Sequence, residues 1–124
     1  MGNRFYGEGN LGADPELRYT RDGDDDSAVC NLRVYFDKPV PVEDGGFEDK
    51  GGFWMNVELW GPRGVACADL LAKGARVQVE GSLIGKRWQD ESGEDRTGLA
   101  VRARRVNPDL MTVDALKQKA KQGA

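Results

Sequence analysis

The sequence contains no histidine and only two cysteines, and both shortages narrow the range of functions. Histidine is the commonest general base and the commonest metal ligand in proteins, so its absence disfavours hydrolase and zinc-enzyme chemistry. Cys30 and Cys67 lie far apart and form no CxxC motif, which favours two buried free thiols over a disulfide or a pair of metal ligands. These absences favour a non-enzymatic binding protein that needs neither metal nor cofactor.

Long apolar runs are missing as well. No stretch approaches the roughly 20 apolar residues that are needed to span a bilayer. The opening residues, MGNRFYGEGN, lack the apolar segment of a signal peptide. We therefore expect a cytoplasmic protein that does not enter a membrane. The length of 124 residues corresponds to one ordinary domain.

Strong net charge is also absent, since the formal charge is −3, yet the acids are unevenly distributed. Twelve of the 21 carboxylates fall in three turn-rich windows, at residues 22–26, 43–49 and 90–95. The nine acids outside these windows are accompanied by all 18 Lys and Arg residues. Because a partner responds to the local field more than to the total charge, the remaining scaffold can attract a polyanion.

The chain is rich in strand signals. Alternating and β-branched segments occur at residues 4–11, 28–36, 53–60, 75–84 and 97–106. One internal segment, residues 63–73, has the apolar spacing of a helix, with Pro62 before it and Gly74 after it. Five short strands with one α-helix between the third and the fourth predict an all-β fold, the five-stranded Greek-key barrel called the OB-fold.

The barrel domain is expected to span residues 1–106, and a polar C-terminal tail to follow at residues 107–124. Thr112 can cap a helix over residues 113–122, although this segment is polar enough to be frayed or disordered. The longest turn between strands, PVPVEDGGFEDKGG at residues 39–52, is expected to be a mobile loop.

Three glycines near the start of the chain have the spacing of a dinucleotide-binding motif but not its structural context. Gly7, Gly9 and Gly12 satisfy GxGxxG, but a dinucleotide fingerprint requires a preceding strand and a helix that opens at its end. Here the motif leads into Ala13-Asp14-Pro15 and a polar turn. The glycines therefore predict a bend in the first strand, where missing Cβ atoms allow tight curvature.

The strand at residues 53–60 has an unusual parity. Its apolar face holds Phe53, Met55, Val57 and Leu59, whereas Trp54 and Trp60 share the other face with Asn56 and Glu58. The same alternation, continued through the remaining strands, places further aromatic and basic residues on faces opposite the core. These residues are Arg33, Tyr35, Trp88, Arg102 and Arg104.

Two interpretations of these tryptophans stay open. They can cover a second apolar layer, at a subunit interface or under a loop, since Trp is common at interfaces. They can also stack on nucleic-acid bases, each stack being worth about 1–3 kcal/mol, with Arg and Lys neutralising phosphates. Six residues of strand separate Trp54 from Trp60 by about 20 Å, which suits several nucleotides of an extended single strand.

Five segments resemble the bacterial single-stranded DNA-binding proteins of the homo-oligomeric OB-fold type. They are GNLGADPELRYT, AVCNLRV, FWMNVELWG, LLAKGARVQVEGSL and KRWQDESGEDR, and the similarity runs from Gly9 to Val106. The resemblance implies that aromatic residues at the positions of Trp54, Trp60 and Trp88 stack on bases. It also implies phosphate contacts from basic positions such as Lys73, Lys86 and Arg87, and assembly as a homotetramer or, less often, a dimer.

The sequence departs from this family at both ends. The N-terminal strand carries Arg4 and Gly7 in place of a clean apolar run. Family members typically end in an acidic tail closing in Pro-Phe, which recruits repair and replication partners, whereas this chain ends in KQKAKQGA. Either the tail has been removed, or the protein is a specialised version, as mobile elements and phages carry, that coats DNA without that recruitment. We therefore do not count tail-mediated repair or replication partners among its expected partners.

The sequence therefore predicts a sequence-independent protein that coats and protects single-stranded DNA in replication, recombination and repair. The expected contact residues are Trp54, Trp60, Trp88, Arg33, Tyr35, Lys73, Lys86, Arg87, Arg102 and Arg104. Two other classes stay open: an OB-fold interaction or accessory module of replication or conjugation, and a carboxylate-dependent nuclease that needs divalent metal. DNA and RNA are not distinguished, because stacking tolerates both.

Overall fold

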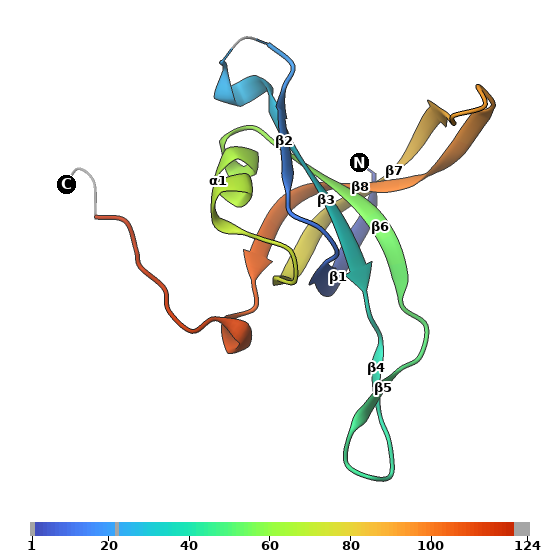
Figure 1. Cartoon of the computed structure of the whole chain (residues 1–124), viewed down its shortest axis with the longest axis vertical. Coiled ribbons are helices and arrows are strands. Elements are labelled where there is room, and N and C mark those ends of the chain that lie inside the picture. The colour runs from blue at the N-terminus through green and yellow to red at the C-terminus, as the bar shows by residue number, and fades with distance from the viewer. Residues whose placement is uncertain (1, 22, 121–124) are drawn as a thin grey trace.

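The computed structural model describes residues 2–21 and 23–120 (Figure 1). Its helical elements are α1 (Pro62–Leu70) and two 3₁₀ turns at Asp25–Ser27 and Leu110–Thr112. Its strands are β1 (Asn3–Leu11), β2 (Glu16–Tyr19), β3 (Ala28–Phe36), β4 (Pro39–Pro41), β5 (Phe47–Asp49), β6 (Phe53–Trp60), β7 (Arg76–Gln89) and β8 (Asp95–Pro108). No helix in the part of the chain that the structure describes is long and apolar enough to cross a membrane.

Six strands form one sheet in the order β1-β7-β8-β6-β3-β2, and a further pairing between β1 and β3 closes it into a barrel. β1 pairs with β7 at residues 3–10, and near its end residues 9–11 also pair with β3. A Cβ atom on Gly9 would lie 2.0 Å from the carbonyl oxygen of Tyr35, so only glycine allows the two backbones to approach this closely. The predicted OB-fold is confirmed, with α1 between β6 and β7, but the sheet has six strands rather than the predicted five because Glu16–Tyr19 forms the additional strand β2.

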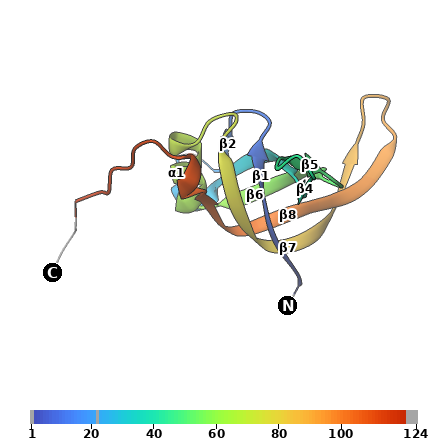
Figure 2. The ribbon, with the colours of Figure 1, turned by 90° about the horizontal axis from the view of Figure 1, so that it is seen from below.

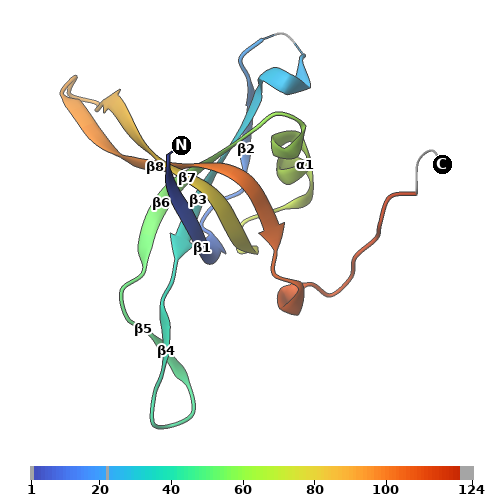
Figure 3. The same cartoon turned by 180° about the vertical axis from the view of Figure 1, so that it is seen from behind.

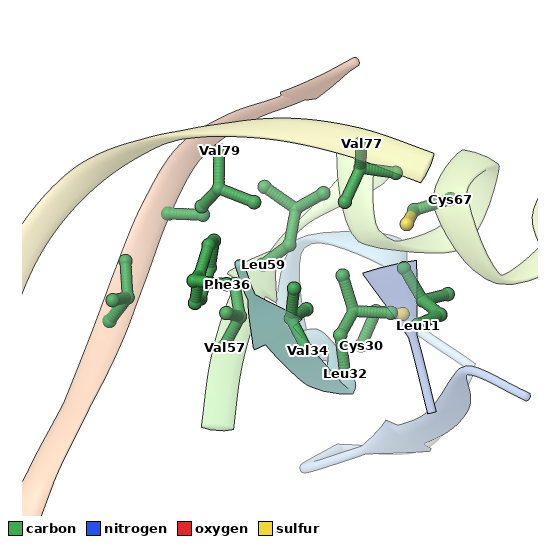
Figure 4. Packing of buried hydrophobic residues seen from close by; sticks show 12 residues of the cluster. Leu11, Cys30, Leu32, Val34, Phe36, Val57, Leu59, Cys67, Val77 and Val79 are labelled. Atoms are coloured by element: carbon green, nitrogen blue, oxygen red, sulfur yellow. The ribbon is translucent and has the colours of Figure 1, made fainter. Parts of the chain in front are cut away.

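Valine is the commonest residue inside the barrel (Figure 4). The predicted apolar faces of β3, β6, β7 and β8 meet there, and five of their valines are wholly buried: Val34, Val57, Val77, Val79 and Val101. Burying one such side chain contributes about 1.5–3 kcal/mol. Cys30 and Cys67 are both buried and free, as predicted, and a Cβ on Gly64 of α1 would lie 3.3 Å from the Cβ of Cys30.

Two hairpins project from the barrel. Figures 1 and 2 show β7 and β8 continuing past the barrel as a long hairpin whose tip is the predicted acidic turn at residues 90–94. The segment at residues 39–52, predicted to be a mobile loop, instead contains the short antiparallel pair β4 and β5. Each of these strands has only three residues, and β4 contains two prolines. Such short strands show too little alternation to be detected from sequence.

The C-terminal prediction was wrong in part. β8 extends to Pro108, and a 3₁₀ turn follows at Leu110–Thr112. Residues 113–120 form no helix, and residues 121–122 of the predicted helix lie outside the described residues. A polar segment of about ten residues is too short to be helical without packing against the barrel, and Figure 3 shows the chain leading away from it.

Candidate nucleic-acid interface

The three tryptophans lie on the outer surface of the molecule. Trp54, Trp60 and Trp88 are 50%, 39% and 51% exposed, whereas Val57 and Leu59 on the opposite face of β6 are 0% and 3% exposed. The parity predicted for β6 is therefore confirmed at Val57 and Leu59, whereas Phe53, predicted on the core face, is 44% exposed and Glu58, predicted on the outer face, is 8% exposed. Large aromatic side chains that remain half-exposed beside a full core are available to a partner.

The surroundings of Trp54 are aromatic. Antiparallel pairing of β3 with β6 places Tyr35 opposite Trp54, and the two ring centroids are 5.2 Å apart with the planes tilted by 58°. The Arg33 guanidinium lies 5.5 Å from the Trp54 ring centroid, within the range of a cation–π interaction. The same guanidinium donates a hydrogen bond of 3.0 Å to Asn56. Two residues of β3 therefore hold the Trp54 ring at the surface.

The Trp54 site is also connected to the β4–β5 hairpin. The hydroxyl of Tyr35 donates a hydrogen bond to the Asp49 carboxylate, and the backbone N–H of Lys38 donates to the same carboxylate at 2.9 Å. The bond to Asp49 raises the pKa of Tyr35 above its ordinary value, and the bond from Tyr35 lowers the pKa of Asp49. The root of the hairpin is therefore fastened to the ring that packs against Trp54.

The surroundings of Trp60 are ionic. The indole N–H of Trp60 donates a hydrogen bond of 3.2 Å to Oε1 of Glu58. Lys86 on β7 and Arg102 on β8 form ion pairs with the same carboxylate, at 2.5 and 3.7 Å. Burial acts to raise the pKa of Glu58, but the hydrogen bonds from Lys86 and Trp60 and the charges of Lys86 and Arg102 outweigh it and lower this pKa. Glu58, whose place between two tryptophans the sequence left unexplained, is the centre of this cluster.

Trp88 lies on the projecting β7–β8 hairpin. It pairs with Arg96 of β8, and a Cβ atom on Gly98 would lie 3.0 Å from its ring, so the ring lies against the backbone of the next strand. Asp90 at the tip accepts a hydrogen bond of 2.9 Å from Nε of Arg96, which ties the turn together. Arg87 is exposed and alternates to the other side of β7 from Trp88.

Two of the predicted cations take positions that the sequence did not show. Lys73 lies in the turn after α1, where its backbone N–H donates to Asp14 at 2.8 Å. In β8, Gly81 pairs with Ala103 and Glu80 with Arg105, so Arg104 is the extra residue of a β-bulge. Arg102 and Arg104 are both exposed with Ala103 buried between them, and Arg104 forms an ion pair with Glu80, at 3.7 Å.

An open hollow beside Trp60 contains two arginines that the sequence reasoning missed. It has a volume of about 1040 Å³, and its lining includes Arg4, Arg63, Arg102 and Arg104. Arg4 comes from β1 and Arg63 from the first turn of α1, so both are brought there by the closure of the barrel. Two features of the sequence could have pointed to these arginines. Arg4 has the outward parity in its strand, and Arg63 comes just after the strand that carries Trp60.

A closed Greek-key barrel with exposed aromatic and basic residues on its outer face defines the OB-fold class that binds oligonucleotides or oligosaccharides. The model of the single-strand binding protein family matches residues 3–109, and the chain belongs to this family. A single-stranded DNA-binding protein of Thermosynechococcus vestitus is 33% identical over 100 residues, which are 80% of this chain and 75% of the relative.

Two solved structures are similar in fold. The small single-stranded DNA-binding protein from Streptomyces coelicolor has a TM-score of 0.73 at 20% identity, covering 90% of this chain and 97% of that one. A deletion mutant of the single-stranded DNA binding protein from Thermus aquaticus has a TM-score of 0.65 at 30% identity, covering 86% of this chain and 49% of that one. The predicted fold class and the family resemblance are thus confirmed.

Proposed function

We propose that the protein binds single-stranded DNA irrespective of its sequence, by stacking bases on Trp54, Trp60 and Trp88. The observation that carries this proposal is the set of half-exposed tryptophans on the outer face, each with a basic residue nearby. Every base has a π-face, so stacking of this kind tolerates any sequence. Family membership and the similarity to a protein named for single-stranded DNA binding support the same conclusion.

The bound single-stranded DNA is expected to run along β6. Trp54 and Trp60 are separated by about 20 Å of extended chain, and the cations Arg33, Lys86 and Arg102 lie between or beside them. Trp88 then receives bases on the projecting hairpin. Phosphate neutralisation by these cations releases counterions, so the affinity falls as salt rises.

The proposed role is to coat and protect single strands in replication, recombination and repair, as a cytoplasmic protein without enzymatic activity. Several copies are expected to assemble, as a homotetramer or a dimer. β1 supports this expectation because residues 3–8 pair with β7 on one edge, while the described residues provide no strand on the other edge. An unpaired edge of this length is a surface that a second copy can extend.

The test is a titration of the protein with poly(dT), followed by quenching of tryptophan fluorescence at two salt concentrations. We expect strong quenching, weaker binding at the higher salt, and a clear loss of affinity for Trp54→Ala. Absence of both quenching and salt dependence would contradict the proposal and favour a protein-interaction module. Incubation of the DNA with magnesium or manganese, without cleavage, would dismiss the nuclease alternative.

A further inference from the structure

Glu58 is an unexpected residue on a surface that is proposed to bind a polyanion. Its side chain is only 11% exposed, whereas the side chains of its partners Lys86 and Arg102 are 40% and 56% exposed. The carboxylate therefore lies beneath two cations that still reach solvent. Its lowered pKa keeps it ionised near neutral pH, so its negative charge is present whenever DNA would bind.

The arrangement of the cluster resembles that of a bound phosphate. Both carboxylate oxygens are engaged: Oε1 faces Trp60 and Arg102, and Oε2 faces Lys86. The three partners come from three neighbouring strands, since β6 lies beside β8 and β8 beside β7. An anion that gathers two cations and an indole N–H at one point makes the contacts that a DNA phosphate would make with them.

We infer that Glu58 acts as an internal stand-in for a phosphate, which restrains DNA affinity at Lys86 and Arg102 while it positions the Trp60 ring. This inference rests on the proposed function. Glu58 already neutralises part of the positive charge of Lys86 and Arg102. Binding of DNA at these two residues therefore releases fewer counterions than binding at two free cations would. The hydrogen bond to Trp60 fixes the ring orientation through the same carboxylate, which makes Glu58 a positioning residue with two separable effects.

Glu58→Gln separates these effects, because the amide oxygen can still accept from Trp60 while the negative charge is removed. We expect this variant to bind poly(dT) more tightly than the natural chain at low salt. Each freed cation adds about 0.7 to the slope of log affinity against log salt for a single strand. Between about 50 and 300 mM salt, its advantage should therefore shrink by about 3.5-fold for one freed cation and about 12-fold for two.

A matched control is Asp114→Asn, which changes the net charge equally at an exposed residue that follows the last strand and belongs to neither tryptophan site. It should leave both affinity and salt slope unchanged. The positioning effect is read in a protein whose single tryptophan is Trp60, made with Trp54→Phe and Trp88→Phe. In that background the Trp60 emission should be preserved by Glu58→Gln and shifted by Glu58→Met, which cannot accept a hydrogen bond from the indole.

A double-mutant cycle tests the competition independently. If Glu58 competes with DNA for Lys86, then Lys86→Gln should cost more affinity in the Glu58→Gln protein than in the natural chain. Equal costs, together with an unchanged salt slope for Glu58→Gln, would overturn the inference while DNA binding itself stands. Loss of DNA binding by the natural chain and every variant alike would instead overturn the proposed function.

Discussion

Trp54 and Trp60 occupy the same face of the same strand, six residues apart, yet they are held by different forces. Trp54 packs against the ring of Tyr35 and beneath the Arg33 guanidinium. Trp60 is held by a hydrogen bond to Glu58, within a cluster of one acid and two bases. β6 therefore presents two tryptophan platforms to the same ligand. Trp54 is the aromatic platform, and Trp60 is the ionic platform.

The comparison teaches that two half-exposed tryptophans on one strand can have different electrostatic surroundings. At the Trp54 site the nearby cation, Arg33, donates a hydrogen bond to the neutral amide of Asn56 rather than to a carboxylate, so its charge remains available to a phosphate. At the Trp60 site the cations already face a carboxylate. We therefore expect the two platforms to differ in their contribution to affinity and in their response to pH.

The largest expected effect is the loss of affinity on replacing each tryptophan by alanine. Removal of a stacking platform costs about 1–3 kcal/mol per base. Trp54→Ala should fall near the upper end, because Trp54 is the more exposed ring and has a cation whose charge is free. Trp60→Ala should fall near the lower end. Fluorescence titration with poly(dT) measures both, and equal losses would show that the ionic surroundings of Trp60 do not weaken its stack.

A smaller effect is expected from moving the Trp54 ring without removing it. A Cβ atom on Gly12 would lie 2.5 Å from that ring, so Gly12→Ala must displace it, and we expect a loss of about 1 kcal/mol in DNA affinity. The control is Gly85→Ala on β7, where an added Cβ meets nothing within 4 Å. Unchanged affinity for Gly12→Ala would show that the observed position of the ring is not the one that binds DNA.

The parity of β6 could be predicted from sequence because it depends only on alternation along one strand. Val57 and Leu59 must be buried, so Trp54 and Trp60 must face outward whatever the rest of the fold does. The barrel fold could be predicted equally well, since it follows from the order of the strands and the single helix along the chain. These are properties of local pattern and element order.

The composition of each platform could not be predicted, because it depends on which strands become neighbours. Glu58 meets Lys86 and Arg102 only after β6 pairs with β8 and β8 with β7. The bulge at Arg104 and the closure that brings Arg4 beside Trp60 are likewise results of pairing over long sequence separations. Local alternation has no information on such pairings.

Acid should weaken the ionic cluster around Trp60. The folded-state pKa of Glu58 lies below its ordinary value of about 4.3. The stability that this carboxylate contributes is thus present above that value and lost as the pH falls through the lower folded-state pKa. The difference in free energy of unfolding between the natural chain and Glu58→Gln, measured by denaturant titration, should stay constant from neutral pH to about 4.3 and shrink below it. A difference that is unchanged below this pH would mean that the Glu58 charge does not stabilise the folded cluster.

Alkali should produce the smallest effect, and at the Trp54 site. The bond to Asp49 raises the pKa of Tyr35 above its ordinary value of about 10. The stabilising contribution of the protonated hydroxyl is therefore present below that value and lost as the pH rises through the higher folded-state pKa. We expect a tyrosine ionisation step above about 10 by ultraviolet difference absorbance, and Tyr35→Phe identifies it by removing it. Asp49→Ala should move that step down toward about 10, whereas an unmoved step would mean that the hydroxyl does not depend on Asp49.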